Sequence, residues 1–248
     1  MIGPLKLALW FSGAGLQAVI GGVMLRRKLY REFPLFFAFI FGQVIRFLVL
    51  FGAYQAGNRE SYRQAFLVLE AVDALLSFAV IYELYAHTFR AYDGIRELGW
   101  VLLRWASAVL LIVAVVAAAS SSGSDSDRFL AGLFALEQSI SIVRGGLLFL
   151  LFLFHAALGL RWGRHAFGIA LGLGLLTSIA LAAFTLRAHF GALSTSTLSL
   201  ITSAAYNCAV IVWLVAVLRP AAERIALPRV PRWDLDGWNR TLLELMQR

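Results

Sequence analysis

Ionisable side chains occur inside three long apolar runs of this sequence, where a membrane-spanning helix normally carries none. Arg46 lies in one run, Glu70 and Asp73 lie in the next, and Glu137 and Arg144 lie in a later one. Charges at bilayer depth are costly, and they occur mainly where they pair, face the interior of a helix bundle or line a polar pathway. We therefore predict that these charges meet in one polar site inside the membrane.

The distances of three of these residues from the ends of their runs indicate a shared depth. At ~1.5 Å per helical residue, Arg46 lies roughly 13 Å from the end of its run at Gln55. By the same rise of ~1.5 Å per residue, Glu70 and Asp73 lie roughly 12 and 16 Å from the start of theirs at Tyr62. Because consecutive spans are antiparallel, these two run ends are on the same side. We expect Arg46 to contact Glu70 or Asp73.

Glu137, Ser141 and Arg144 form one polar stripe. Arg144 follows Glu137 by seven positions, and about 100° of rotation per residue returns the helix to nearly the same face. We expect this stripe to face the charges of the two earlier runs.

These charges have two interpretations. In the first, they are buried pairs that fix helix register and bind nothing. In the second, three acids against two arginines, with further polar side chains nearby, form a small cavity that opens to the outside and holds a polar ligand. The candidate ligand-binding residues are Gln43, Arg46, Glu70, Asp73, Glu137, Ser141, Arg144, Tyr206 and Asn207.

A second polar group lies nearer the other end of the same runs. Glu83 and His87 are four residues apart and share a helix face, and His155 lies at a comparable depth. Carboxylate and imidazole could hold a metal or a haem. Histidines at a membrane interface are more often solvated or hydrogen-bonded, and Arg90 is close enough to pair with Glu83. We therefore expect no metal and no cofactor.

The composition requires an integral membrane protein. Of the 248 residues, 60% are hydrophobic and 15% are charged, with a mean hydropathy of +0.79, whereas charged residues approach a quarter of a soluble domain. Each long apolar run can cross ~30 Å of hydrocarbon. We predict an all-α bundle of seven transmembrane helices, followed by a tail at 221–248, with spans near 5–25, 34–56, 62–87, 100–119, 128–160, 166–186 and 197–218.

The distribution of lysine and arginine predicts the orientation. Fifteen of the 22 such residues flank the spans on one side and five on the other, and positively charged loops face the cytoplasm. The N-terminus is then outside and the C-terminus is cytoplasmic. We expect a multi-pass protein of the plasma membrane, which in a bacterium is the inner membrane. Although the net charge is +8, its dispersal among loops excludes a nucleic-acid partner. Membrane lipid is the expected partner.

Residues 221–248 are too few for a catalytic domain outside the membrane. We expect no enzyme and assign no catalytic residue. Asp234 or Asp236 could cap a short amphipathic helix in this tail, with Trp238, Leu242 and neighbouring apolar residues on one face. This helix could lie on the membrane surface or dock on a cytoplasmic or membrane protein partner.

The seven-span plan with an external N-terminus resembles the general layout of heptahelical receptors and sensors. The resemblance is to topology alone: the last span has neither the retinal lysine of rhodopsins nor the zinc histidines of ceramidase-like hydrolases. All five prolines lie outside the spans or at their ends, whereas alternating-access carriers typically break helices near the midplane. We therefore predict a receptor-like or sensory protein that binds a small polar or amphipathic ligand. A transporter or ion-coupled permease and a structural subunit of a membrane complex are the alternatives.

Overall fold

The computed structural model describes residues 4–57, 59–88, 126–158, 163–190 and 195–219, together with the single positions 101, 104, 105, 108 and 112. In this part of the chain all regular structure is helical. The elements are α1 (Pro4–Arg26), the short 3-10 helix η1 (Leu29–Arg31), α2 (Pro34–Gln55), α3 (Arg59–Thr88), α5 (Ser126–Leu158), α6 (Arg164–Phe190) and α7 (Thr195–Leu218).

Six of these helices, among the residues described, are long and apolar enough to cross a membrane. Large apolar side chains such as Leu75 and Phe149 are 71% and 66% exposed, which suits a surface in contact with lipid. The predicted span at 100–119 falls mostly outside the described residues, as does the tail at 221–248. A count of seven helices, the orientation and the choice of membrane therefore stay predictions.

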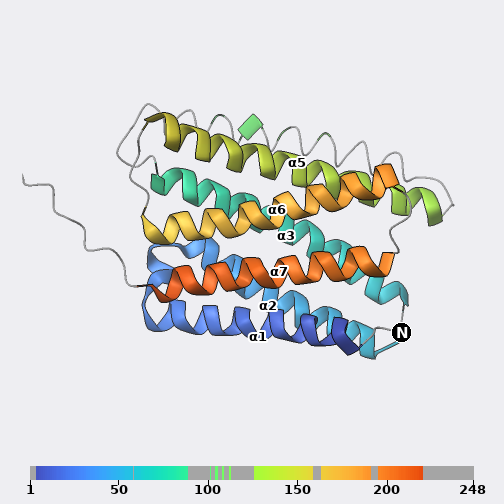
Figure 1. Cartoon of the computed structure of the whole chain (residues 1–248). Helices are drawn as coiled ribbons and strands as arrows, with labels where there is room; N and C mark the ends of the chain where they lie inside the picture. The colour runs from blue at the N-terminus through green and yellow to red at the C-terminus, as the bar shows by residue number, and fades with distance from the viewer. Residues whose placement is uncertain are drawn as a thin grey trace, which may run out of the picture.

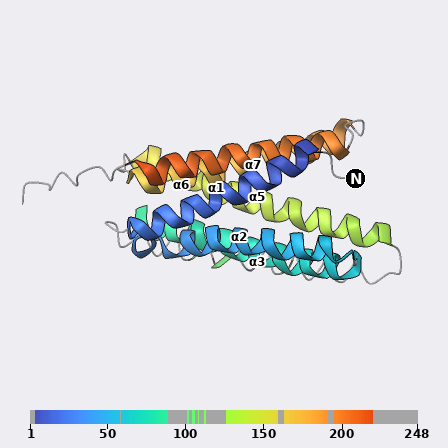
Figure 2. The same cartoon turned by 90° about the horizontal axis from the view of Figure 1, so that it is seen from below.

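The six long helices lie side by side in a single bundle, and successive helices run in opposite directions except α3 and α5, which run in the same direction (Figure 1). Along the chain α1 packs on α2, α2 on α3, α3 on α5, α5 on α6 and α6 on α7, and α7 returns to α1. Figure 2 shows the same bundle from below, with α1 crossing between the layer of α7 and that of α2. One end of the bundle carries η1, and we call it the η1 end. There α1, α3, α5 and α7 finish and α2 and α6 begin.

Local sequence explains where several helices begin and end. Pro34 begins α2 at a position where a backbone N–H is not required. Gly57 follows the end of α2 with a φ of 71°, a left-handed conformation that glycine adopts without strain and that commonly ends a helix. The chain then turns directly into α3, so α2 and α3 pack as antiparallel neighbours.

Close contact between α6 and α7 depends on two glycines spaced four residues apart. A Cβ atom at Gly172 would overlap the ring of Trp213, and one at Gly168 would overlap Ala216. Trp213 is fully buried, and its Nε1 donates to the carbonyl oxygen of Ile169 at 3.1 Å. Small residues at this spacing allow two helix backbones to approach closely.

The main buried cluster lies on one side of the middle of the bundle. In the described part of the chain it contains Ile20 and Met24 of α1, the first turns of α2, the second half of α3, and residues of α5, α6 and α7 that are also nearer the η1 end. Polar side chains begin where this cluster stops. The apolar core and the candidate site are therefore stacked along the bundle axis.

Candidate functional site

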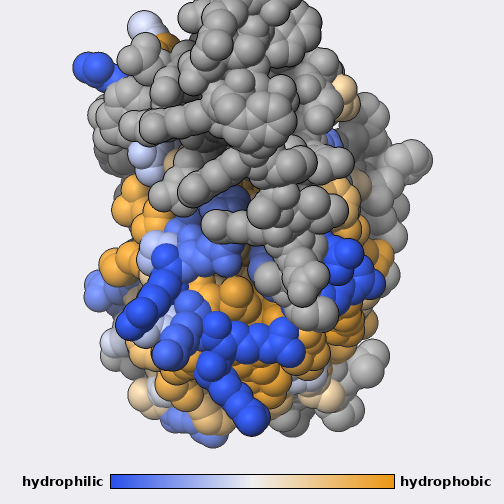
Figure 3. Space-filling model, turned by 90° about the vertical axis from the view of Figure 1, so that its left-hand side faces the viewer, coloured by the Kyte–Doolittle hydropathy of each residue, from blue (hydrophilic) through white to orange (hydrophobic). Residues whose placement is uncertain are grey.

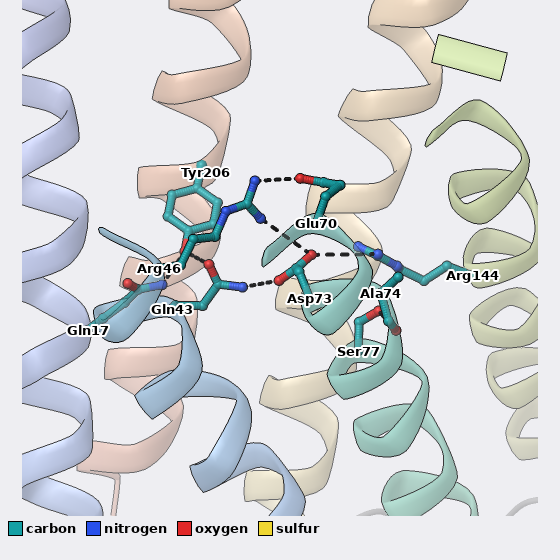
Figure 4. A network of polar contacts seen from close by, with 9 residues as sticks. All are labelled: Gln17, Gln43, Arg46, Glu70, Asp73, Ala74, Ser77, Arg144 and Tyr206. Carbon is teal, nitrogen blue, oxygen red and sulfur yellow. Dashed lines mark hydrogen bonds and ion pairs between the residues drawn. The ribbon is translucent and has the colours of Figure 1, made fainter. Parts of the chain in front are cut away.

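The central charged contact joins α2 and α3. Nη2 of Arg46 lies 2.5 Å from Oε2 of Glu70, and its Nη1 lies 3.8 Å from Oδ2 of Asp73 (Figure 4). The expected contact of Arg46 with Glu70 or Asp73 is confirmed as a contact. A role of these residues in ligand binding stays a prediction.

Asp73 is shared between several helices. Its Oδ1 accepts a hydrogen bond from Nε2 of Gln43. Its Oδ2 lies between two guanidinium groups, 3.8 Å from Arg46 and 3.9 Å from Nη2 of Arg144 on α5. Both distances are too long for hydrogen bonds. One carboxylate oxygen is thus hydrogen-bonded, whereas the other faces two cations at longer range.

The same network extends through amides and a hydroxyl to α7 and α1. The hydroxyl of Tyr206 donates to Oε1 of Gln43 at 3.3 Å and accepts a hydrogen bond from Nε2 of Gln17. Gln17 was missed by sequence reasoning, although an amide in the middle of an apolar run is a usable signal. We call the connected set the polar layer, which consists of Gln17, Gln43, Arg46, Glu70, Asp73, Arg144 and Tyr206.

Helical spacing explains why these side chains meet. Gln43 and Arg46 are three residues apart on α2, and Glu70 and Asp73 are three apart on α3, so each pair projects from one helix face. Because α2 and α3 pack along their length, the two pairs face each other. The long side chain of Arg46 then reaches both carboxylates.

Arg144 is the least satisfied member of the polar layer. Its side chain is only 11% exposed, and its Nε is buried without a hydrogen-bond partner. Among the described residues its one ion pair within 4 Å is with Asp73, at 3.9 Å. Buried donors are nearly always hydrogen-bonded, so an unbonded guanidinium calls for an explanation.

The remaining predicted site residues lie apart from these charges. Asn207 accepts a hydrogen bond from Ser12 at 3.0 Å and donates to the carbonyl oxygens of Leu9 and Ser203. It therefore ties α7 to α1. Ser141 is buried on α5. The side chain of Glu137 lies outside the described residues, so the predicted stripe is not tested.

Glu83 has partners that the sequence did not suggest. Its Oε1 and Oε2 accept the backbone N–H groups of Leu35 and Phe36, each at 2.8 Å. The carboxylate thus caps the first turn of α2, where the helix dipole favours negative charge. Arg90, the expected partner, lies outside the described residues. Sequence reasoning could not find this cap, because Glu83 is 47 to 48 residues from the N–H groups it accepts.

The histidines near the η1 end also bond locally. Nε2 of His87 lies 3.7 Å from Oε1 of Glu32, and its ring packs on Phe33 with centroids 4.8 Å apart. Nδ1 of His165 lies 2.8 Å from the carbonyl oxygen of Ala216. Because a carbonyl only accepts, Nδ1 carries the proton in this contact. Within the described ranges, no three His, Cys, Asp or Glu residues are grouped to hold a metal ion.

The end of α7 is capped from α1. Nη1 of Arg27 donates to the carbonyl oxygens of Val217, Leu218 and Arg219, at distances between 2.6 and 3.3 Å. An arginine on the last carbonyls of a helix satisfies acceptors that have no partner within the helix. Together with Glu83 and His165, Arg27 gives the η1 end a structural set of contacts. Buried atoms without a hydrogen-bond partner occur in both regions, at Nε of Arg144 in the polar layer and at Oγ1 of Thr88 and Nδ1 of His155 near the η1 end.

Comparisons of the chain with protein-family models, with curated proteins and with solved structures found no match. The polar layer is therefore the feature from which the function has to be inferred.

Proposed function

We propose that the protein is a receptor-like multi-pass membrane protein that binds a small polar ligand at the polar layer. The observation that carries this proposal is Arg144, whose side chain is only 11% exposed beside Asp73 and whose Nε is buried without a hydrogen-bond partner. A ligand oxygen would supply the acceptor that this guanidinium lacks.

The geometry limits the chemistry of the ligand. Arg144 offers only N–H donors, so the group that binds it must carry an acceptor oxygen such as a carboxylate, phosphate or carbonyl oxygen. Oδ2 of Asp73 accepts no hydrogen bond at 3.8 and 3.9 Å from its two guanidinium neighbours. A hydroxyl or amine on the ligand could donate to it. The preferred ligand is thus a small molecule with an acceptor and a donor close together.

We assign different roles to Arg46 and Arg144. Arg46 has a carboxylate oxygen at 2.5 Å and a second at 3.8 Å, which supports a structural role in holding α2 against α3. Arg144 has only the longer contact to Asp73. We therefore assign register to the Arg46–Glu70 pair and ligand recognition to Arg144 with Asp73.

The position of the core supports access from the end opposite η1. On the η1 side of the polar layer, the described helices pack into the main buried cluster, which leaves no route through close-packed side chains. By the positive-inside prediction the opposite end faces outward. The ligand would then arrive from the outer side or from the outer leaflet.

The test is mass spectrometry of small molecules retained by the purified full-length protein. We expect a species that carries acceptor oxygens to be retained by the wild type, and to be lost from Arg144→Gln and from Asp73→Asn. Both variants should melt lower than the wild type, because each unbalances the buried charges, so retention is measured at a temperature at which circular dichroism shows them folded. Arg63→Gln is the matched control, because Arg63 is exposed and pairs only weakly with Glu60 at 3.3 Å. Equal retention by Arg144→Gln would overturn the assignment.

A flux assay separates a receptor from a transporter. The same variants are reconstituted in proteoliposomes with the retained species as the labelled solute. Binding without flux supports the receptor-like function. Flux that requires Arg144 would replace it by a transport function at the same site.

A further inference from the structure

Exposed cations gather at the η1 end, where no described acid pairs with them. Figure 3 looks onto this end and shows strongly hydrophilic side chains spread over an apolar bundle. The set, which we call the basic end, is Arg26, Arg27, Lys28, Arg31, Arg164 and Arg219, all exposed. None of the six forms an ion pair with a described residue. This charge is therefore available to an external anion.

The described acids at this end do not neutralise it. Glu83 is buried and accepts two backbone N–H groups of α2. Glu32 lies beside His87 at 3.7 Å. Among the described residues, the basic end thus carries an excess of positive charge, and its six cations lie at helix termini or in the turn that contains η1.

Apolar side chains border the cations directly. Leu25 precedes Arg26 and is 54% exposed, and Leu218 precedes Arg219 and is 45% exposed. A cation one residue beyond a lipid-facing leucine lies at the depth of phospholipid headgroups. This arrangement suits a partner that has both an acyl chain and a phosphate. Free phosphate and nucleic acid have no acyl chain.

Lys28 adds an independent observation. It has a φ of 58° and a ψ of 22°, and it is the one non-glycine residue with positive φ in the described part of the chain. The left-handed conformation is unfavourable for a residue with a Cβ, and glycine would adopt it freely. A lysine at this turn therefore costs conformational energy that a glycine would not, and it provides an exposed charge.

We infer that the basic end binds the phosphate groups of anionic phospholipids in the leaflet that it faces. Lys28, Arg31 and Arg164 make the contacts, because Arg27 is already engaged with the end of α7. Each cation near a membrane surface contributes roughly fivefold to the affinity for anionic lipid, the equivalent of ~1 kcal/mol. This inference does not depend on the ligand proposed for the polar layer.

The experiment is a lipid titration of the full-length protein in neutral detergent, followed by its melting temperature. We expect phosphatidylglycerol to raise the melting temperature at lower concentration than phosphatidylcholine. The apparent affinity for phosphatidylglycerol should fall about fivefold in Lys28→Gly and further in the triple variant with Arg31→Gln and Arg164→Gln. Arg63→Gln, a cation removed at the opposite end, should leave the titration unchanged.

Lys28→Gly separates a loss of lipid affinity from a loss of folding stability. Glycine relieves the left-handed backbone, so this variant should melt no lower than the wild type without lipid while losing affinity for phosphatidylglycerol. Three results would overturn the inference: equal affinity in the triple variant, no preference for phosphatidylglycerol over phosphatidylcholine, or the same stabilisation by inorganic phosphate, which would indicate a site for a free anion.

Discussion

Asp73 shows how a single carboxylate can organise four helices. It lies on α3, accepts a hydrogen bond from Gln43 of α2, and faces Arg46 of α2 and Arg144 of α5. Gln43 then connects to α7 through Tyr206. Arg46, Arg144, Glu70 and Asp73 balance in charge, which makes a buried charged layer tolerable in an apolar bundle.

The first prediction concerns the Arg46–Glu70 pair. Arg46→Leu leaves a carboxylate without its closest cation, which should destabilise the protein by about 3 to 5 kcal/mol. Adding Glu70→Gln should recover most of that loss, because the uncompensated charge is removed. Chemical denaturation in detergent measures both free energies.

The geometry also predicts which acid couples more strongly to Arg46. Glu70 lies at 2.5 Å and Asp73 at 3.8 Å, so Asp73→Asn should recover less than Glu70→Gln. The exposed Arg63–Glu60 pair is the control, and Arg63→Leu should change the free energy of unfolding by less than about 0.5 kcal/mol. Additive losses in the double variants would contradict the pairing.

At the scale of elements, two helix ends are closed by side chains from other helices. In α2, Pro34 has no N–H, Glu83 accepts from the next two residues, and Phe37 donates to the carbonyl oxygen of Phe33. In α7, the last four carbonyl oxygens accept from Arg219 N, His165 and Arg27. Every end group of these two helices near the η1 end therefore has a partner, as burial at that depth requires.

The second prediction concerns the cap of α2. Glu83→Gln retains one acceptor oxygen but turns an amide N–H₂ toward a backbone donor. We expect a loss of about 1.5 to 3 kcal/mol, the usual range for a hydrogen bond to a charged group. Thermal denaturation of the variant beside Glu60→Gln, an exposed glutamate, checks this. An unchanged melting temperature for Glu83→Gln would exclude a stabilising cap.

The third prediction concerns the contact between α6 and α7. The added methyl group of Gly172→Ala meets Trp213, which is fully buried and cannot move aside, so we expect a loss of about 1 to 3 kcal/mol. Gly146→Ala on α5 is the matched control, because nothing lies within 4 Å of its added Cβ. That control should be neutral or gain up to ~1 kcal/mol from helix propensity. The free energy of unfolding distinguishes the two.

At the scale of the whole molecule, the η1 half of the described bundle contains the main buried cluster and the six exposed cations of the basic end. The main buried cluster lies between the polar layer and the exposed arginines of this end. Positive charge next to a membrane span favours the cytoplasmic side. In the orientation predicted from the charges, the main buried cluster lies on the cytoplasmic side of the polar layer.

The fourth prediction tests that orientation. Cys208 is the single cysteine of the chain, so Cys208→Ala provides a background for new ones. We expect Ala56→Cys to be labelled by an impermeant thiol reagent on intact cells. Arg31→Cys should be labelled only after permeabilisation, and the reverse pattern would invert the topology.

Helix positions and residue depth could be predicted from the sequence alone. The observed α2 and α7 agree to within two residues with the spans predicted at 34–56 and 197–218, because length and apolar content decide which segments can lie in a bilayer. Arg46 met Glu70 and Asp73 as expected, because a fixed helical rise makes depth a local property. The rise alone did not predict that Arg144 lies at the level of Asp73.

Lateral neighbours were decided only by the tertiary structure. Depth says nothing about which helices pack together or how each is rotated, so Gln17 on α1 was not expected to reach Tyr206 on α7. The bonding of Glu83 to the first turn of α2 depends on backbone groups that no residue pattern marks. Arg144 approaches Asp73 without a hydrogen bond because the packing of α5 against α3 sets that separation. These contacts join helices that are distant in the sequence, so they are set only when the helices pack together.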